Sequence, residues 1–298
     1  VEWVGCVLHD LIQPGFSFLV GAAMAFSIAN RRARGQSAAA VTLHAFWRAF
    51  LLVALGVFLR SMGRPQTNYT FEDTLSQIGL GYGFLYLIAQ GSTRLRWLAL
   101  LVILVGYWLL FALWPLPGPD FDWSKTANTP DWEHNLSGFA AHWNKNTNPA
   151  WAFDVWFLNL FPRQSPFTAN GGGYSTLSFI PTLGTMILGL LAGDVVRSSR
   201  SSARKVLWLI VVGLASLGLG YLMGYLGICP VVKRIWTPSW VLFSGGWCML
   251  FLAGFYAIVD GLGWKWLVFP LIVLGMNSIA AYVMDGLLPG FIRDVLRR

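Results

Sequence analysis

The sequence predicts an all-α protein, a polytopic membrane helix bundle with about eight transmembrane helices and one long extracytoplasmic loop. Three observations lead to this fold class. Hydrophobic residues make up 56% of the 298 residues and charged residues only 11%, whereas soluble domains carry about 25% charge; the mean hydropathy is +0.57. Sixteen tryptophans suit aromatic belts at two membrane interfaces. Long apolar stretches follow one another along the chain.

These stretches supply the elements, because a helix of roughly 20 apolar residues crosses a bilayer. In chain order they are 11–30, 41–60, 76–91, 97–114, 174–196, 206–226, 239–259 and 266–284. The third, 76–91, is short and rich in glycine, and its inclusion brings the number of spans to eight.

Basic residues set the orientation, since cytoplasmic loops carry an excess of lysine and arginine. Basic clusters at 31–34, 94–96 and 197–205 follow the first, third and fifth spans. With eight spans all three clusters lie on one side, which we expect to be cytoplasmic. The formal net charge of +8 is mostly this topology signal and does not indicate a nucleic-acid partner. We expect the apolar outer surface of the bundle to contact the lipid bilayer.

Residues 115–173 form the one sizeable polar region, which we interpret as an extracytoplasmic cap inserted into a single transmembrane domain spanning 1–298. Tryptophans alternate there with carboxylates and amides. This composition fits a sugar-binding surface, and it fits equally a cap whose tryptophans sit at headgroup level. We expect both termini of the chain to be truncated, because Val1 begins within a hydrophobic context.

Polar residues also occur inside the spans. Asp10, Gln13 and Ser17 fall three or four residues apart on the first helix and so share one face. His44 and Arg48 form an i,i+4 pair near the cytoplasmic end of the second span, where the arginine either snorkels to the headgroups or holds a phosphate. Such a seam either joins helices through hydrogen bonds or lines a wet cavity.

Motifs of soluble enzymes are lacking, and the four histidines and three cysteines have no metal-ligand spacing. No metal is therefore expected. Cys6 and Cys229 both fall at outer ends of helices, an oxidising location, which allows a disulfide between them.

Four segments carry a resemblance to the heparan-α-glucosaminide N-acetyltransferase family and its bacterial relatives. They are EWVGCVLHDLIQPGFSFLVGAAMAFSI, YSTLSFIPTLGTMILGLLAGDVV, CPVVKRIWTPSWVLFSGGW and GMNSIAAYV, in that order along almost the whole chain. The first resembles the family's ADLVFP segment, and the third its N-K-x-x-WT motif.

The resemblance implies a transmembrane acetyltransferase that takes acetyl-CoA from the cytoplasmic side and passes the acetyl group to the amine of an extracytoplasmic amino sugar. Counted from Trp3, the family's catalytic histidine would precede Val1. Asp10 matches the aspartate of ADLVFP, and a carboxylate there can fix the tautomer of an imidazole. His9 stands where the family has alanine; it is either a substitute base or a solvated side chain. Gln77 replaces an arginine of many relatives.

We therefore predict a polar pocket in the outer half of the bundle. The catalytic candidates are Asp10, Lys233, Asn277 and Ser278. The substrate-binding candidates are Gln13, Tyr174, Ser175, Thr176, Trp236, Thr237 and Ser239. The candidates for binding acetyl-CoA are His44, Arg48 and Gln77. Gly171–Gly173 would let backbone approach the thioester, and Lys233 could neutralise a tetrahedral oxyanion.

Two alternatives stay open: a transporter or flippase of a glycan or lipid precursor, and a scaffold that has lost catalysis. The first would use the same polar seam, but no inverted internal repeat is visible in the sequence. The expected location is the bacterial cytoplasmic (inner) membrane, and a homodimer is left open.

Overall fold

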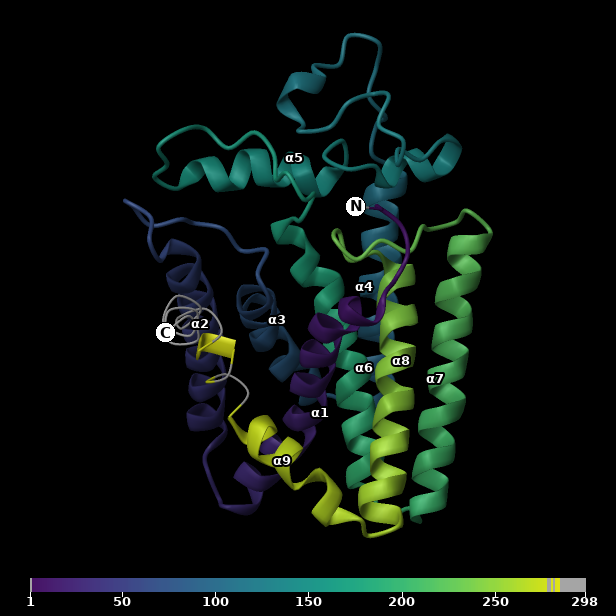
Figure 1. The fold of residues 1–298 in the computed structure, drawn as a ribbon. Coiled ribbons are helices and arrows are strands. Elements are labelled where there is room, and N and C mark those ends of the chain that lie inside the picture. Colours follow the sequence, from purple (N-terminus) through teal and green to yellow (C-terminus); the bar gives the residue numbers. More distant parts are fainter. Residues whose placement is uncertain (1, 278–279, 281, 285–298) are drawn as a thin grey trace, which may run out of the picture.

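The computed structural model describes residues 2–277, 280 and 282–284, and within them the chain is a helical bundle under a cap (Figure 1). The helices are α1 (Ile12–Ala33), α2 (Ala38–Ser61), α3 (Thr74–Ala89), α4 (Thr93–Ala112), α5 (Pro149–Phe157), α6 (Phe179–Arg197), α7 (Ser202–Tyr225), α8 (Pro238–Tyr256) and α9 (Phe269–Met276). Short 3-10 turns, among them η1 (Leu8–Leu11), connect some of them.

Six of these helices are long and apolar enough to cross a membrane, and α3 is a shorter apolar helix beside them. This confirms the predicted polytopic membrane bundle. The expected last span, 266–284, is not one long helix in the described residues: α9 covers Phe269–Met276, and part of the remainder lies outside the described residues. The short α3 is accommodated because its side chains are largely buried among other helices.

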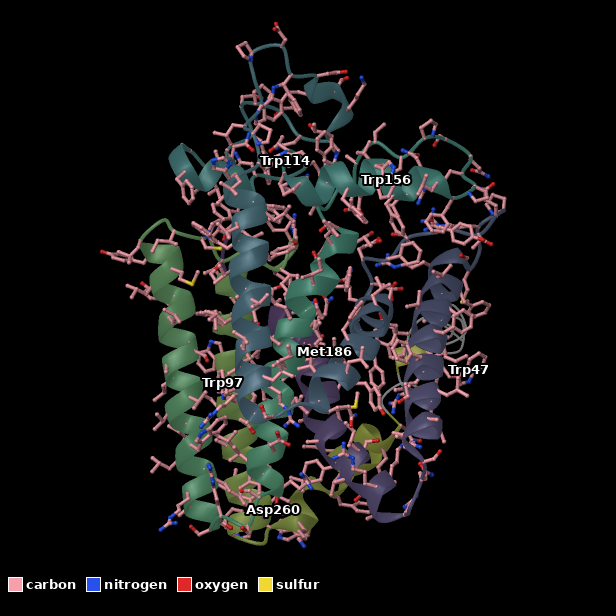
Figure 2. All side chains as sticks on the ribbon, turned by 180° about the vertical axis from the view of Figure 1, so that it is seen from behind. Trp47, Trp97, Trp114, Trp156, Met186 and Asp260 are labelled. Atoms are coloured by element: carbon pink, nitrogen blue, oxygen red, sulfur yellow. The ribbon has the colours of Figure 1, made fainter. Side chains whose placement is uncertain are left out.

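The turns after α1, α3 and α6 lie at one end of the bundle, and the cap lies at the other (Figure 1). We call these the inner and outer ends. The basic clusters share the inner end, which is the arrangement their spacing predicts. Seen from behind, Trp114 and Trp156 lie toward the outer end (Figure 2), where tryptophans of an interfacial belt are expected.

Helix α6 lies at the centre and packs closely on α1. A Cβ atom added to Gly21 of α1 would lie 1.8 Å from the carbonyl oxygen of Met186, and one added to Gly189 of α6 would lie 1.9 Å from that of Phe18. Only glycine permits this approach of two backbones. The contact fixes the outer end of α1 relative to the chain entering α6.

The cysteines differ from one sequence expectation. All three are free, so the disulfide between Cys6 and Cys229 is not formed. The sulfur of Cys229 is instead buried and lies 3.5 Å from the Ser239 hydroxyl oxygen. Burial raises the pKa of the Cys229 thiol to about 11, which disfavours the thiolate needed for exchange.

Candidate active site at the outer end

An ion pair joins the first helix to the loop that precedes α8. Asp10 lies in η1, where its Oδ2 accepts a hydrogen bond from the Val7 amide at 3.0 Å. Its Oδ1 lies 2.9 Å from the Nζ atom of Lys233. The two side chains are 26% and 17% exposed, so the pair is partly desolvated but still open to the outside. His9, in the same turn, is exposed.

The loop that carries Lys233 is held by hydroxyl groups of the first turn of α8. The Thr237 hydroxyl caps α8 by accepting from the Trp240 amide at 3.3 Å, and it accepts from the Val232 amide at 3.0 Å. The Ser239 hydroxyl donates to the Pro230 carbonyl at 2.7 Å. Both hydroxyls are fully buried. Their partners lie within the protein, which makes them supports of the lysine.

Trp236 also helps to hold the loop that carries Lys233. Its φ of +50° is in the left-handed region that side chains rarely adopt, and such strain persists only where the surroundings fix it. The indole is buried, and its Nε1 donates to the Thr185 hydroxyl at 3.1 Å. Trp236 thereby anchors the loop to α6.

Arg234 adds a second cation beside Lys233. Its guanidinium lies 5.8 Å from the ring centroid of Trp3 and 5.9 Å from that of Tyr174, within the range of cation–π attraction. It also donates to the Gly172 carbonyl at 3.0 Å. In the part of the chain that the structure describes, Arg234 forms no ion pair, so its charge is available to an anionic group at the outer end.

Gln77 lies at this outer end, apart from His44 and Arg48. Its Nε2 donates to the carbonyls of Ser175 and Thr176 at 3.3 and 3.1 Å. The reason is the direction of α3, which enters from the outer end so that its first turn lies there. His44 and Arg48 are exposed on α2. The three residues expected to bind acetyl-CoA are therefore not brought together.

The other expected residues are distributed as follows. Gln13 is half-buried, one turn along from Asp10. Asn277 is exposed and follows α9, which lies toward the inner end (Figure 1); the structure does not bring it to the Asp10–Lys233 pair. Ser278 lies outside the described residues.

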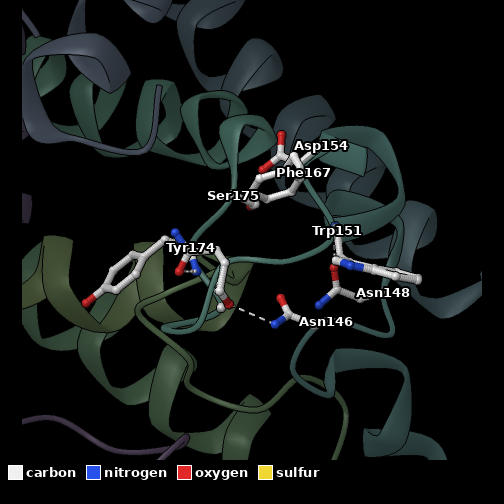
Figure 3. A pocket seen from close by; sticks show the side chains of 9 residues that line it. Asn146, Asn148, Trp151, Asp154, Phe167, Tyr174 and Ser175 are labelled. Carbon is white, nitrogen blue, oxygen red and sulfur yellow. Dashed lines mark hydrogen bonds between the residues drawn. The ribbon is translucent and has the colours of Figure 1, made fainter. Parts of the chain in front are cut away.

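A polar slot that is too narrow to admit a water molecule lies beneath α5, beside the triple glycine (Figure 3). Its polar lining is Asn146, Asn148, Asp154, Asn170, Tyr174 and Ser175. Asp154 is 3% exposed, and its Oδ2 accepts from the Thr176 amide at 2.9 Å. Burial raises the pKa of Asp154 to about 7, and the charge of Glu72 adds to the rise, while hydrogen bonds from Thr176 oppose it.

The inner end holds a separate pocket of about 290 Å³ between α1, α3, α4 and α6. Its charged lining is Arg32, Arg96, Asp194 and Arg197. Arg96 pairs with Asp194 and donates to the Ala89 carbonyl at 2.6 Å. The pocket thus has more positive than negative groups, which suits a phosphorylated ligand.

Sequence reasoning missed Arg234, Asp154 and these inner arginines. The sequence analysis explains the basic clusters mostly by topology, although their repeated place near the inner ends of α1, α3 and α6 also indicates a shared basic site. Arg234 adjoins a lysine that was chosen. Asp154 is one of several carboxylates in the polar region 115–173, and nothing local sets it apart, because the residues around it include distant ones such as Asn170 and Ser175.

Known proteins similar to this chain are named as N-acetyltransferases. The chain is 24% identical over 321 aligned residues to the heparan-alpha-glucosaminide N-acetyltransferase of Homo sapiens, covering 95% of this chain and 47% of that protein. It is 22% identical over 324 residues to the enzyme of the same name from Mus musculus, covering 95% and 48%. The chain spans about half the length of these curated relatives. No family model matches it. The similarity supports a relation to these N-acetyltransferases.

Proposed function

We propose that this protein is a transmembrane acetyltransferase that moves an acetyl group from acetyl-CoA at the inner end to the amine of an amino sugar at the outer end. The observation that carries the proposal is the similarity along 95% of the chain to N-acetyltransferases. Two polar sites at opposite ends of one bundle agree with it. Because the chain spans about half of these relatives, the activity of the whole protein is itself part of the proposal.

The inner pocket suits the donor. Arg32, Arg96 and Arg197 line it, and guanidinium groups bind phosphate oxygens through paired hydrogen bonds. The phosphates of acetyl-CoA would be held there. The helices that form this pocket include α1, which Asp10 precedes in η1, and α6, which Ser175 and Thr176 precede. The thioester would approach the outer end between them.

The outer end suits the transfer. An amine attacks the thioester carbonyl, a C–N bond forms, and the C–S bond breaks as the thiol leaves. Lys233 neutralises the oxyanion that develops on the carbonyl oxygen. Asp10 holds Lys233 in place at 2.9 Å and would orient the imidazole of a histidine preceding Val1 in the full-length protein, which would serve as base.

The proposed location is the bacterial cytoplasmic membrane, with the cap outside. The homodimer stays a prediction. A transporter would carry its substrate across without acetylating it, and a scaffold without catalysis would do neither.

Binding of acetyl-CoA tests the inner half of the proposal. The full-length protein in nanodiscs should bind acetyl-CoA, and Arg96→Gln should weaken binding by about tenfold or more, the effect of losing one charged hydrogen bond. Arg94→Gln is the matched control, because Arg94 is exposed two residues away and does not line the pocket. Equal affinity in the two variants would contradict the assignment of the donor site.

A further inference from the structure

A second basic pocket lies at the inner end, beside the turn that joins α1 to α2 (Figure 1). Its volume is about 370 Å³, many times the roughly 30 Å³ that a water molecule occupies in the liquid, so a phosphate group has room to enter. The last turns of α1 and the turn after them supply the lining, which is Ser27, Asn30, Arg31, Arg34 and Gln36. The pocket proposed for the donor is lined by other residues.

The lining of this pocket is cationic and polar. Its described residues include two arginines and no carboxylate. Neither Arg31 nor Arg34 forms an ion pair among the described residues, and Arg31 donates to the neutral side chain of Gln36 at 3.0 Å. The Ser27 hydroxyl and the Asn30 amide can donate further hydrogen bonds. The pocket therefore suits an anion that accepts several hydrogen bonds, as phosphate oxygens do.

Two basic residues of α2 add to the positive charge at this end. Arg31 and Arg48 lie close enough to His44 for their charges to act on its imidazole. Side chains of a helix lean toward its N-terminus, and α2 begins at the inner end (Figure 1), so His44 and Arg48 lean toward that end. Arg48 lies within a membrane-spanning helix, where an uncompensated charge is costly. An anion held at the inner surface would compensate it.

Apolar side chains of α2 lie beside these basic ones. Within the described part of the chain, α2 packs on α3 rather than on α1, which leaves much of its surface uncovered. Leu43 and Trp47 are 73% and 55% exposed, and Trp47 points away from the bundle (Figure 2). They form one i,i+4 pair, and His44 and Arg48 form the next one around the helix. A ligand at this end of α2 therefore meets cations and hydrocarbon together, which an anionic lipid matches with its phosphate and acyl chains.

We propose that this pocket binds the phosphodiester of an anionic lipid of the inner leaflet, with Arg31 and Arg34 at the phosphate and the acyl chains along α2 beside Leu43 and Trp47. Anionic lipids occur in the cytoplasmic leaflet, and basic pockets on that side of a helical bundle bind their head groups. The site is separate from acetyl transfer. The bound lipid joins the inner ends of α1 and α2.

Lipid selectivity tests this proposal. Full-length protein in detergent is titrated with phosphatidylglycerol or with phosphatidylcholine of the same acyl chains, and native mass spectrometry measures the bound lipid. Wild type should bind phosphatidylglycerol about tenfold or more tightly than phosphatidylcholine, and the double variant Arg31→Gln/Arg34→Gln should lose most of this preference. Arg204→Gln is the matched control, because Arg204 is exposed in α7 near the same end and does not line the pocket; it should keep the preference.

Two further measurements separate a lipid from other phosphates. Glycerol phosphate, which carries the phosphate without acyl chains, should not displace phosphatidylglycerol at equal concentration, and displacement would refute a lipid ligand. The double variant should bind acetyl-CoA as wild type does. Loss of acetyl-CoA binding with an unchanged preference for phosphatidylglycerol would assign the pocket to the donor and overturn the proposal.

The comparison of the two lipids also decides on its own. Equal binding of phosphatidylglycerol and phosphatidylcholine by wild type would overturn the proposal, as would an equal loss of preference in Arg204→Gln and in the double variant. If the double variant does not fold, Arg34→Gln alone replaces it, because Arg34 is exposed after the last turn of α1.

Discussion

Replacing Gly21 by alanine tests whether α1 and α6 touch through their backbones. The added Cβ atom would lie 1.8 Å from the carbonyl oxygen of Met186 and 2.7 Å from its carbonyl carbon. Ordinary carbon–oxygen contacts lie at about 3.3 Å or more. The helices would therefore have to separate by roughly 1.5 Å, because the obstructing atoms are backbone and cannot rotate away.

Overpacking of this kind costs about 1–3 kcal/mol, occasionally more. We expect the upper end, about 3 kcal/mol, since the contact lies at the centre of the bundle. At about 2–4 °C per kcal/mol for a chain of this size class, the Tm should fall on the order of 10 °C. Differential scanning fluorimetry in detergent, following the tryptophans, measures this.

Gly15→Ala is the matched control, because Gly15 lies on the same helix and a Cβ added there meets nothing within 4 Å. It should leave the Tm unchanged or slightly raised, as alanine favours the helix. A Tm of Gly21→Ala equal to that of Gly15→Ala would refute the close packing of α1 on α6.

Three further predictions follow from the outer end. Asp10→Asn in the full-length protein should fold and bind acetyl-CoA but lose about two orders of magnitude in kcat; full turnover would exclude a catalytic role for Asp10. Folding raises the pKa of Asp154 to about 7, so its contribution to stability is present below its unfolded pKa and is lost as the pH rises through 7. Asp154→Asn, which cannot ionise, should therefore be more stable than wild type at pH 8, by up to about 4 kcal/mol, and similar at pH 4. Denaturant unfolding at both pH values measures the two free energies of unfolding, and equal values for the two proteins at pH 8 would contradict the raised pKa. Thiol titration of the denatured, unreduced chain should find Cys6 and Cys229 free, and a loss of two thiols would contradict the structure.

Much of the bundle could be predicted from the sequence because the length of an apolar run is a local property. The run 41–60 became α2 (Ala38–Ser61), and 206–226 became α7 (Ser202–Tyr225). The short run 76–91 was also a helix. The last run, 266–284, shows where prediction from run length fails, because hydropathy does not determine whether a segment forms one continuous helix.

The site was less predictable because its contacts join distant residues. Asp10 and Lys233 were both candidates, yet nothing local told that they pair across 223 positions. The hydroxyls of Thr237 and Ser239 are predicted from the sequence to bind substrate. In the structure they instead cap α8 and hold the loop that precedes it. Gln77 was assigned to the donor, although the expected direction of its helix already places it outside.

The sidedness of acetyl transfer tests the central claim most directly. Full-length protein is reconstituted into vesicles in one orientation, which is determined from the side on which the cap lies. ¹⁴C-acetyl-CoA is then supplied on the inner-end side, and glucosamine is supplied only on the cap side. The account predicts labelled N-acetylglucosamine on the cap side, none when acetyl-CoA is supplied on that side alone, and loss of the product with Arg96→Gln but not Arg94→Gln. Glucosamine that crosses the membrane without being acetylated, or acetylation that needs both substrates on one side, would contradict it.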